Sequence, residues 1–573
     1  MADSLLHKTE NPLLEFKVEI SDKPFISSEG ISFPRTVHVT FYDEYGKKIK
    51  TEDYGHTDIN QLYEKIKAGD PINLNECCIV DFSLSEYREK YNLSEREKIV
   101  LKNFSAKNSF FDCESTTDFS YAEFDGNKTG FESSVFTNGT VNFNGADFGQ
   151  GNVSFRRTKF GNGKLDFQYA KFGTGNVTFQ YAHFGNGDVS FVNTDFGDGQ
   201  VDFRSIVFGN GHIDFKYARF GKGDVSFEKT IFGKGKKDFK TVEFAGGKID
   251  FRRVDFGEGD VSFEAAEFGT GKTSFWMARF GKGNVNFQTA DFSLSEISFE
   301  KTEFDSDHVS FYNVKAASIS FRSSNLNAHF DFRFQHCGFL DLSDCVLKNA
   351  IDLVPAFDSV KGKDGSMSTI YSFNISGMRN LGRIFIDWKK NNVKHLIYSQ
   401  EETSWRAKSE QFRILKEEFN STGQYDDEDK AYVRFKRCEQ IADLQEAIKE
   451  NRLNALWAYP QYGFKWLVFD QIGNYGTNPA RVIVSMFAVY SFYSIMYFVL
   501  TNFTSAAIFS AIEQHKINTV GEAFYFSAIT YLTVGYGDFY PTGFLRMVAA
   551  TEAFIGLFLM SYFTVAFVRK ILR

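Results

Sequence analysis

FGNGKLDFQYAK at residues 160–171 is followed directly by FGTGNVTFQYAH at residues 172–183, and the two stretches are copies of one 12-residue repeat. Phe recurs every 12 residues from Phe119 to Phe311, which makes 17 copies, and a second Phe series lies five residues further on. A fixed short period predicts a solenoid, in which each repeat packs only against its neighbours.

Each repeat divides into two five-residue units followed by two extra residues, as in VSFRR and TKFGN over residues 153–162. This pattern resembles the pentapeptide-repeat family. The resemblance implies a right-handed parallel β-solenoid in which the central Phe and the small residue two positions before it point inward. Phe155 and Val153 form one expected inward pair, and Phe160 and Thr158 form the next.

One coil of such a solenoid can hold 12 or 24 residues. A 12-residue coil has two sides, which leave little room for two Phe, one Val and one Ala or Thr. A four-sided coil of 24 residues encloses about four times that area, so close packing favours it. The repeats then make roughly eight coils and a body ~40 Å long, whereas 12-residue coils predict ~80 Å.

Single residues of the repeat carry further expectations. Proline does not occur between Pro71 and Pro355, as expected where every amide hydrogen bonds to the next coil. Gly161 and Gly163 are expected at corners. Lys237 occupies an inward position that other repeats give to Val, and we expect a local kink there.

The composition and the repeat limit the function of this part of the chain. The formal net charge of −8 argues against nucleic-acid binding, which needs a basic face. GNGD, GKGD and GEGD come near the turn of calcium-binding β-rolls, but most repeats carry Lys, Asn, His or Gln in place of the Asp. A structural scaffold or docking surface is therefore the default interpretation. No residue pattern indicates catalysis, so we expect no enzyme and no cofactor.

TVGYGD at residues 533–538 lies between two hydrophobic segments, 482–500 and 547–568, which are long enough to cross a membrane. In such a run each peptide can turn its carbonyl oxygen inward, and four copies around an axis stack oxygen cages that replace the water around a cation. Gly535 and Gly537 would supply the positive φ values that this arrangement needs.

The hexapeptide matches the selectivity filter of potassium channels, and residues 481–573 resemble the two-helix pore module of that superfamily. The resemblance implies a homotetramer in a lipid bilayer, with potassium ions as the permeant ligand. The potassium-binding residues are then Thr533, Val534, Gly535, Tyr536 and Gly537.

A helix is expected before the filter, over residues 520–532, because Thr519 and Glu522 form a capping box. Potassium channels often carry Trp where this chain has Tyr525. We expect Tyr525 to support the filter, since its hydroxyl could still hydrogen-bond Asp538.

Two residues of the second hydrophobic segment are candidates for gating. Gly556 aligns with the glycine at which the inner helix of related channels bends, although it could equally be a small residue for helix packing. Glu552 is an ionisable group inside the membrane. It either lines the pore or braces the filter, or it pairs with a nearby hydroxyl of the pore helix in a structural role.

The chain divides into an α/β cap, the solenoid, a linker with a helical hairpin, an interfacial aromatic segment and a pore domain. Their expected ranges are 1–103, 104–355, 356–456, 457–480 and 481–573. The hairpin is interpreted as a solvated spacer, with the acids of Asp426–Asp429 suited to the positive end of its second helix. Arg481 before the first span and Arg569 and Lys570 after the second predict a multi-pass cell-membrane protein whose N-terminal region and C-terminus are cytoplasmic.

These features together predict a potassium-selective, homotetrameric channel whose cytoplasmic solenoid regulates gating, with an unidentified ligand or protein partner. A signal from the solenoid would reach the pore through the hairpin, or through contact with residues 569–573. One alternative is a weakly selective cation channel. Another is a solenoid scaffold that recruits a protein partner and uses the pore module as its membrane anchor.

Overall fold

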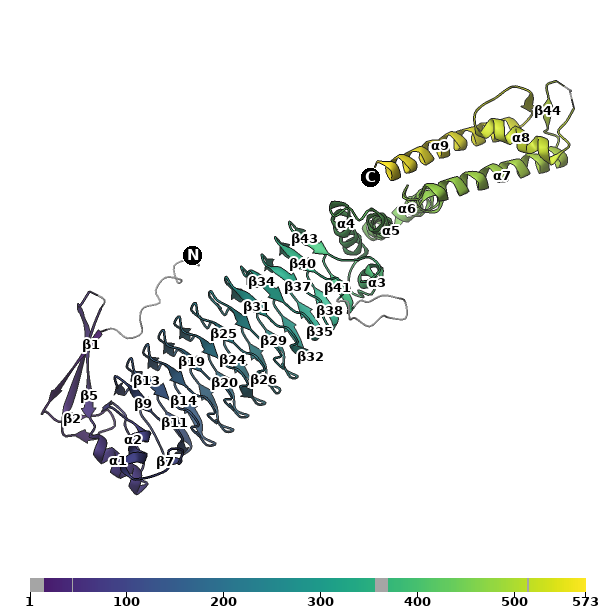
Figure 1. Ribbon diagram of the computed structural model, residues 1–573. Helices are drawn as coiled ribbons and strands as arrows, with labels where there is room; N and C mark the ends of the chain where they lie inside the picture. The colour runs from purple at the N-terminus through teal and green to yellow at the C-terminus, as the bar shows by residue number, and fades with distance from the viewer. Residues whose placement is uncertain (1–14, 44, 356–368, 513–514, 573) are drawn as a thin grey trace. The chain divides into compact units, whose positions relative to one another are not determined.

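The computed structural model describes residues 15–43, 45–355, 369–512 and 515–572. The chain forms two compact units, Met1–Glu401 and Glu402–Arg573. Figure 1 shows a ladder of short strands in the first unit and helices in the second.

The first unit contains a parallel β-solenoid of about 12 turns with a spacing of about 24 residues. Val153, Val177 and Val201 lie side by side in successive coils, each 24 residues after the last. This confirms the 24-residue coil.

The strands of each side of the coil stack into long sheets. An 11-stranded sheet in the described residues consists of β11 (Lys128–Gly130), β14 (Asn152–Ser154), β17 (Val177–Thr178), β20 (Val201–Asp202), β24 (Val225–Ser226), β27 (Ile249–Asp250), β29 (Thr273–Ser274), β32 (Asp291–Ser298), β35 (Lys315–Ser320), β38 (His336–Asp341) and β41 (Ile370–Asn374). A second sheet consists of β9 (Thr116–Asp118), β13 (Thr140–Asn142), β16 (Leu165–Asp166), β19 (Val189–Ser190), β22 (Ile213–Asp214), β25 (Lys237–Asp238), β28 (Val261–Ser262), β31 (Asn284–Asn286), β34 (His308–Ser310), β37 (His329–Asp331), β40 (Ala350–Asp352) and β43 (Arg383–Phe385).

The solenoid has more coils than the eight expected from the Phe period. At its start, β6 (Cys77–Val80) already pairs in parallel with β8 (Phe110–Asp112), and at its end β40 pairs with β43. These terminal coils lack the glycine and phenylalanine pattern of the repeat, so a count of regular copies leaves them out.

Columns of stacked Phe rings fill the interior. Phe155 lies on Phe179 with ring centroids 4.8 Å apart and planes 5° from parallel, and it meets Phe143 edge-on at 5.6 Å. Such pairs contribute about 0.5–1.5 kcal/mol each beyond the burial of their area. The residues expected to point inward are all buried, namely Phe155, Val153, Phe160 and Thr158.

The corners of the coil contain glycine because backbones approach closely there. A Cβ on Gly163 would lie 2.0 Å from the carbonyl oxygen of Gly139, one coil earlier. Positive φ values occur at some of these corner glycines, such as Gly197 with φ of 64°, and also at non-glycine residues such as Arg157 and Tyr181, with φ of 59° and 61°. Side-chain ladders add to the stacking, since Asn162 accepts a hydrogen bond from the backbone N–H of Asn186 at 3.0 Å.

Lys237 causes no kink, contrary to the expectation from sequence. Its strand β25 pairs in register with the strands on both sides. The side chain is 1% exposed, and its Nζ donates to the carbonyl oxygen of Gly233 at 2.6 Å and to that of Glu258. The aliphatic stem thus replaces the Val of other repeats while the ammonium group finds acceptors at a corner.

An α/β cap covers the first coils. β1 (Glu15–Ser21), β4 (Thr36–Tyr42) and β5 (Lys48–His56) form an antiparallel sheet, and β5 then pairs in parallel with β6 of the solenoid. Helix α1 (Ile59–Ala68) follows, with the Asp58 side chain as its N-cap.

The second unit is helical. Its described helices are α4 (Trp405–Ser421), α5 (Tyr425–Glu450), a 3-10 helix (Arg452–Asn454), α6 (Ala455–Lys465), a π-helix (Trp466–Gln471), α7 (Pro479–Phe503), α8 (Val520–Tyr531) and α9 (Leu545–Ile571). Gly423, with φ of 74°, separates α4 from α5. Among the described residues, α7 and α9 are the two helices long and apolar enough to cross a membrane, and they contain the two predicted spans.

Candidate functional site

The loop Thr533–Asp538 connects helix α8 to β45 (Phe539–Pro541). Gly535 and Gly537 have φ values of 59° and 78°, in the left-handed region that glycine adopts most readily. Hydrogen bonds connect the loop backbone to helix α8, because Val534 and Gly535 donate their N–H groups to the carbonyl oxygen of Ile529 at 2.9 and 3.3 Å.

The carbonyl groups of this loop have no such partners. Among the described residues, none donates a hydrogen bond to the carbonyl oxygens of Thr533–Gly537. The side chains of Val534 and Tyr536 are 47% and 73% exposed, although they lie between two membrane-spanning helices. Carbonyl oxygens need donors or cations, so the exposed carbonyl groups of this loop are free to accept from water or to coordinate a cation.

Helix α8 ends at this loop. Its capping box is complete, with the Thr519 side chain accepting from the Glu522 N–H and the Glu522 side chain accepting from the Thr519 N–H. The helix therefore starts where the sequence predicts, and its last carbonyls lie next to the loop, where they favour a cation.

Tyr525 and Asp538, the predicted filter supports, lie close to each other. The Asp538 carboxylate is near enough to the Tyr525 hydroxyl to interact electrostatically with it. The Tyr525 ring also packs against Phe539 with centroids 5.8 Å apart. One carboxylate oxygen of Asp538, Oδ1, is buried and has no hydrogen-bond partner in the described part of the chain.

Glu552 connects three helices behind the loop. Its Oε2 accepts a hydrogen bond from the Tyr497 hydroxyl of α7 at 2.8 Å, and its Oε1 accepts one from the Ser527 hydroxyl of α8. All three side chains are completely buried. Of the two roles expected for Glu552, the structure shows the pairing with a pore-helix hydroxyl, and the partner on α7 comes in addition.

Gly556 lies where α9 crosses the end of α8. A Cβ at this position would lie 2.1 Å from the carbonyl oxygen of Tyr531. The residue therefore permits a close approach of two helices, as expected for the packing role.

Residues 480–573 match the family model of ion channels. The match contains both membrane-spanning helices, α8 and the loop with the unpartnered carbonyls. Neither the curated proteins nor the solved structures contain a match to the chain. The segment is hereafter called the channel module. Together with the two helices long enough to cross a membrane, the match indicates a membrane protein with a transport role.

The hairpin helix α5 contacts the end of the channel module. Arg569, in the last turn of α9, lies with its Nη2 3.1 Å from Asp429 Oδ1, and its guanidinium group is 4.5 Å from the centre of the Tyr432 ring. Lys570 Nζ lies 3.0 Å from Asp426 Oδ1 and 3.1 Å from Asp429 Oδ2. These contacts are called the α5–α9 clamp.

Further polar contacts join α5 to the segment before α7. The guanidinium group of Arg437 binds both carboxylate oxygens of Asp470, the shortest distance being 2.7 Å, and Asp470 is 4% exposed. From the channel module, the Tyr562 hydroxyl donates to the Phe469 carbonyl oxygen at 3.3 Å, and Arg481 Nε donates to that of Gln471 at 2.9 Å.

The hairpin is thus more than a solvated spacer. The acids of Asp426–Asp429 were expected to complement the helix dipole, and they also bind cations 140 or more residues away in the sequence. The sequence contains the two kinds of charge that this pairing needs, an acidic run at Asp426–Asp429 and the basic residues Arg569 and Lys570. The sequence alone does not determine which acidic residue pairs with which basic residue.

Proposed function

We propose that the protein is a homotetrameric, potassium-selective channel. The observation that carries the proposal is the exposed loop Thr533–Gly537, whose carbonyl oxygens have no donors among the described residues while the N–H groups of Val534 and Gly535 bind Ile529. Four such loops with their carbonyl groups turned toward a common axis provide the oxygen cages that replace the hydration shell of potassium.

The exposure of apolar residues in one chain supports an assembly. Val534 and Leu532 are each 47% exposed, and an apolar hollow of about 370 Å³ lies between α7 and α8. In a closed ring of identical chains, one surface of each chain packs against a different surface of the next chain, and this contact covers such apolar residues. Four is the number of chains that the carbonyl cage requires.

Ion flux through the reconstituted protein tests this function against its alternatives. Potassium flux at least tenfold above sodium flux, a difference of ~1.4 kcal/mol, supports a potassium channel. Equal flux of the two ions supports the weakly selective cation channel. No flux under any condition supports a scaffold that is anchored by its helices.

We also propose that the module lies in the cell membrane with both outer helix ends in the cytoplasm. Arg481 precedes most of the apolar part of α7, and Arg569 and Lys570 end α9. Positive residues at these ends favour the cytoplasmic side.

The α5–α9 clamp supports a role of the N-terminal region in gating. An inner helix that opens a pore must move at its cytoplasmic end, and that end of α9 is held here by Asp426 and Asp429. A signal can change opening only if it stabilises the open and closed arrangements differently. The clamp would supply such a difference if movement of the α9 end separates Arg569 and Lys570 from Asp426 and Asp429.

A further inference from the structure

One corner of the solenoid is rich in cations. In the 11-stranded sheet, each strand from β14 to β35 is followed directly by a buried Phe, the first being Phe155 and the last Phe321. The two residues after each of these Phe residues form the corner. Over eight coils, from Arg156 to Ser323, these positions hold eight cations and two acids. The corresponding corner after the strands of the second sheet, from Asn144 to Asn313, holds two cations and one acid. The first set of positions is called the basic stripe.

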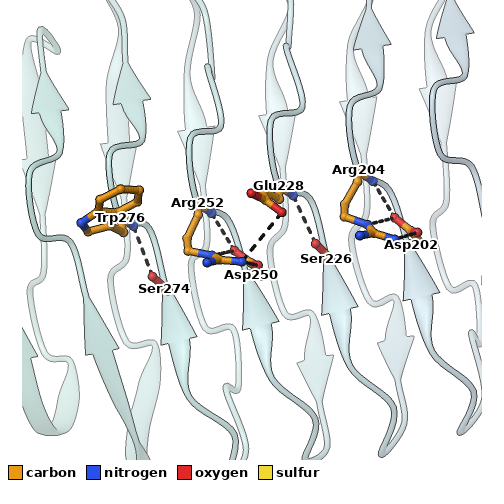
Figure 2. A network of polar contacts seen from close by, with 8 residues as sticks. All are labelled: Asp202, Arg204, Ser226, Glu228, Asp250, Arg252, Ser274 and Trp276. Atoms are coloured by element: carbon orange, nitrogen blue, oxygen red, sulfur yellow. Dashed lines mark hydrogen bonds and ion pairs between the residues drawn. The ribbon is translucent and has the colours of Figure 1, made fainter.

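Part of the stripe is held in place by carboxylates beneath it. Arg204 donates from Nε and Nη2 to both carboxylate oxygens of Asp202, at 2.9 and 2.6 Å, and Arg252 binds Asp250 in the same way. Figure 2 shows the two pairs in one row, with Glu228 on the coil between them and Trp276 on the coil beyond Arg252. The guanidinium planes are thereby fixed before any ligand binds, which lowers the entropy lost on binding.

Arg322 also lies near a carboxylate, with its Nε 3.6 Å from Asp344 Oδ2. The five remaining cations of the stripe have no carboxylate partner within the described ranges. They are Arg156, Arg157, Lys229, Arg253 and Lys301, and all five are exposed. Aromatic rings lie between some of them. The Trp276 ring is 5.2 Å from the Arg253 guanidinium and 5.8 Å from Lys301 Nζ, and the Tyr181 ring is about 6 Å from both Arg156 and Arg157.

We propose that the basic stripe is a docking surface for an extended acidic segment of a partner protein. Charge complementarity favours an acidic partner, because the stripe concentrates positive charge on a chain whose net charge is −8. Coils are ~4.8 Å apart, so the eight coils span ~34 Å, the length of about ten residues of an extended peptide. Trp276 and Tyr181 offer flat apolar surfaces between the charges.

The pattern favours a peptide over a nucleic acid. Glu228 and Glu300 interrupt the row of cations, and a phosphate backbone, which is charged at every unit, would meet both of them. An acidic peptide can place neutral residues there. The proposal does not depend on ion conduction, so it holds or fails separately from the channel function.

Fluorescence anisotropy with the full-length protein in detergent tests the proposal. The probe is a labelled peptide of alternating Glu and Thr, about 12 residues long to match the stripe. We expect saturable binding that weakens at least tenfold in Arg252→Glu/Arg253→Glu. The matched control, Lys216→Glu/Lys240→Glu on the opposite corner, makes the same change in charge and should bind within twofold of the unmodified protein.

A second variant guards against misfolding. Lys229→Glu/Lys301→Glu changes two exposed residues without carboxylate partners in the described part of the chain, and it should weaken peptide binding to a similar degree. Absence of saturable binding, or equal losses in the stripe and control variants, would overturn the proposal. Tighter binding of a single-stranded oligonucleotide of equal length would also overturn it, in favour of a nucleic-acid surface.

Discussion

The Ser527 hydroxyl of the pore helix donates a hydrogen bond to the Glu552 carboxylate of α9, and both residues are completely buried. The Tyr497 hydroxyl of α7 supplies the second donor to the same carboxylate. One side chain therefore fixes the pore helix to both membrane-spanning helices.

Replacing Glu552 tests this connection. Glu552→Ala should lower the stability of the assembled channel by roughly 2–5 kcal/mol, because two buried hydroxyls lose their acceptor and a cavity forms. Glu552→Gln keeps one acceptor and should cost less. Thermal unfolding of the purified protein in detergent measures the difference. Equal stability of the Ala variant and the unmodified protein would show that the network does not support the pore.

The glycines of the loop give a second prediction. Gly535→Ala and Gly537→Ala should each abolish potassium flux, since φ values of 59° and 78° strain a residue with a Cβ. Gly521→Ala is the matched control, because Gly521 lies in the first turn of α8 and is not among the positive-φ glycines. Normal single-channel currents in either loop variant would contradict the assignment of the filter.

The α5–α9 clamp gives a third prediction. Arg569→Glu/Lys570→Glu should change the open probability by about fivefold, which corresponds to ~1 kcal/mol for partly exposed ion pairs. Conductance and selectivity should stay unchanged. Adding Asp426→Lys/Asp429→Lys should restore the original open probability.

Arg413→Glu serves as the control for this series. Arg413 forms an exposed ion pair with Glu417 within α4, away from the clamp residues in the sequence. If Arg413→Glu changes opening as much as the clamp variant, or if the double charge exchange fails to restore it, direct pairing between α5 and α9 does not set the gating equilibrium.

Lys237 gives a prediction about pH. Burial lowers its pKa from 10.5 to about 8 in the folded solenoid. Between pH 8 and pH 10.5 the unfolded chain therefore binds more protons at this residue, so its contribution to stability rises with pH over that range. Below pH 8 both states are protonated and the full cost, on the order of 3 kcal/mol, applies.

Lys237→Met removes this cost. The free energy of unfolding of the variant should exceed that of the unmodified protein near neutral pH, and the difference should shrink as the pH rises toward 10.5. Denaturant unfolding of both proteins at several pH values measures it. A difference that does not vary with pH would show that the Lys237 ammonium group is not the origin of the effect.

Much of the fold follows from residue patterns. The volume of two Phe per repeat favoured the 24-residue coil, and the capping box of Thr519 and Glu522 located the start of α8. The number of coils was underestimated because strands such as β43 pair through backbone groups, which no particular residue type marks. Positive φ at Arg157 and Tyr181 was missed for the same reason, since the repeat places different residue types there.

The polar contacts were less predictable. Sequence indicated that Glu552 needs a partner, and a hydroxyl of the pore helix was among the candidates, but the hydroxyl of Tyr497 was not. The pairing of Arg569 with Asp429 joins residues 140 positions apart. Charge pairs of this kind follow no period, so only the packing of the helices determines them.

The stacked rings of the solenoid also have a mechanical consequence. Each Phe of a column rests on the next, as Phe155 rests on Phe179 at 4.8 Å, and no gap between them can absorb a displacement. Backbone hydrogen bonds connect the same coils along the long sheets. We therefore expect a load applied to one coil to be shared by many others, so that the solenoid resists bending as a stiff rod.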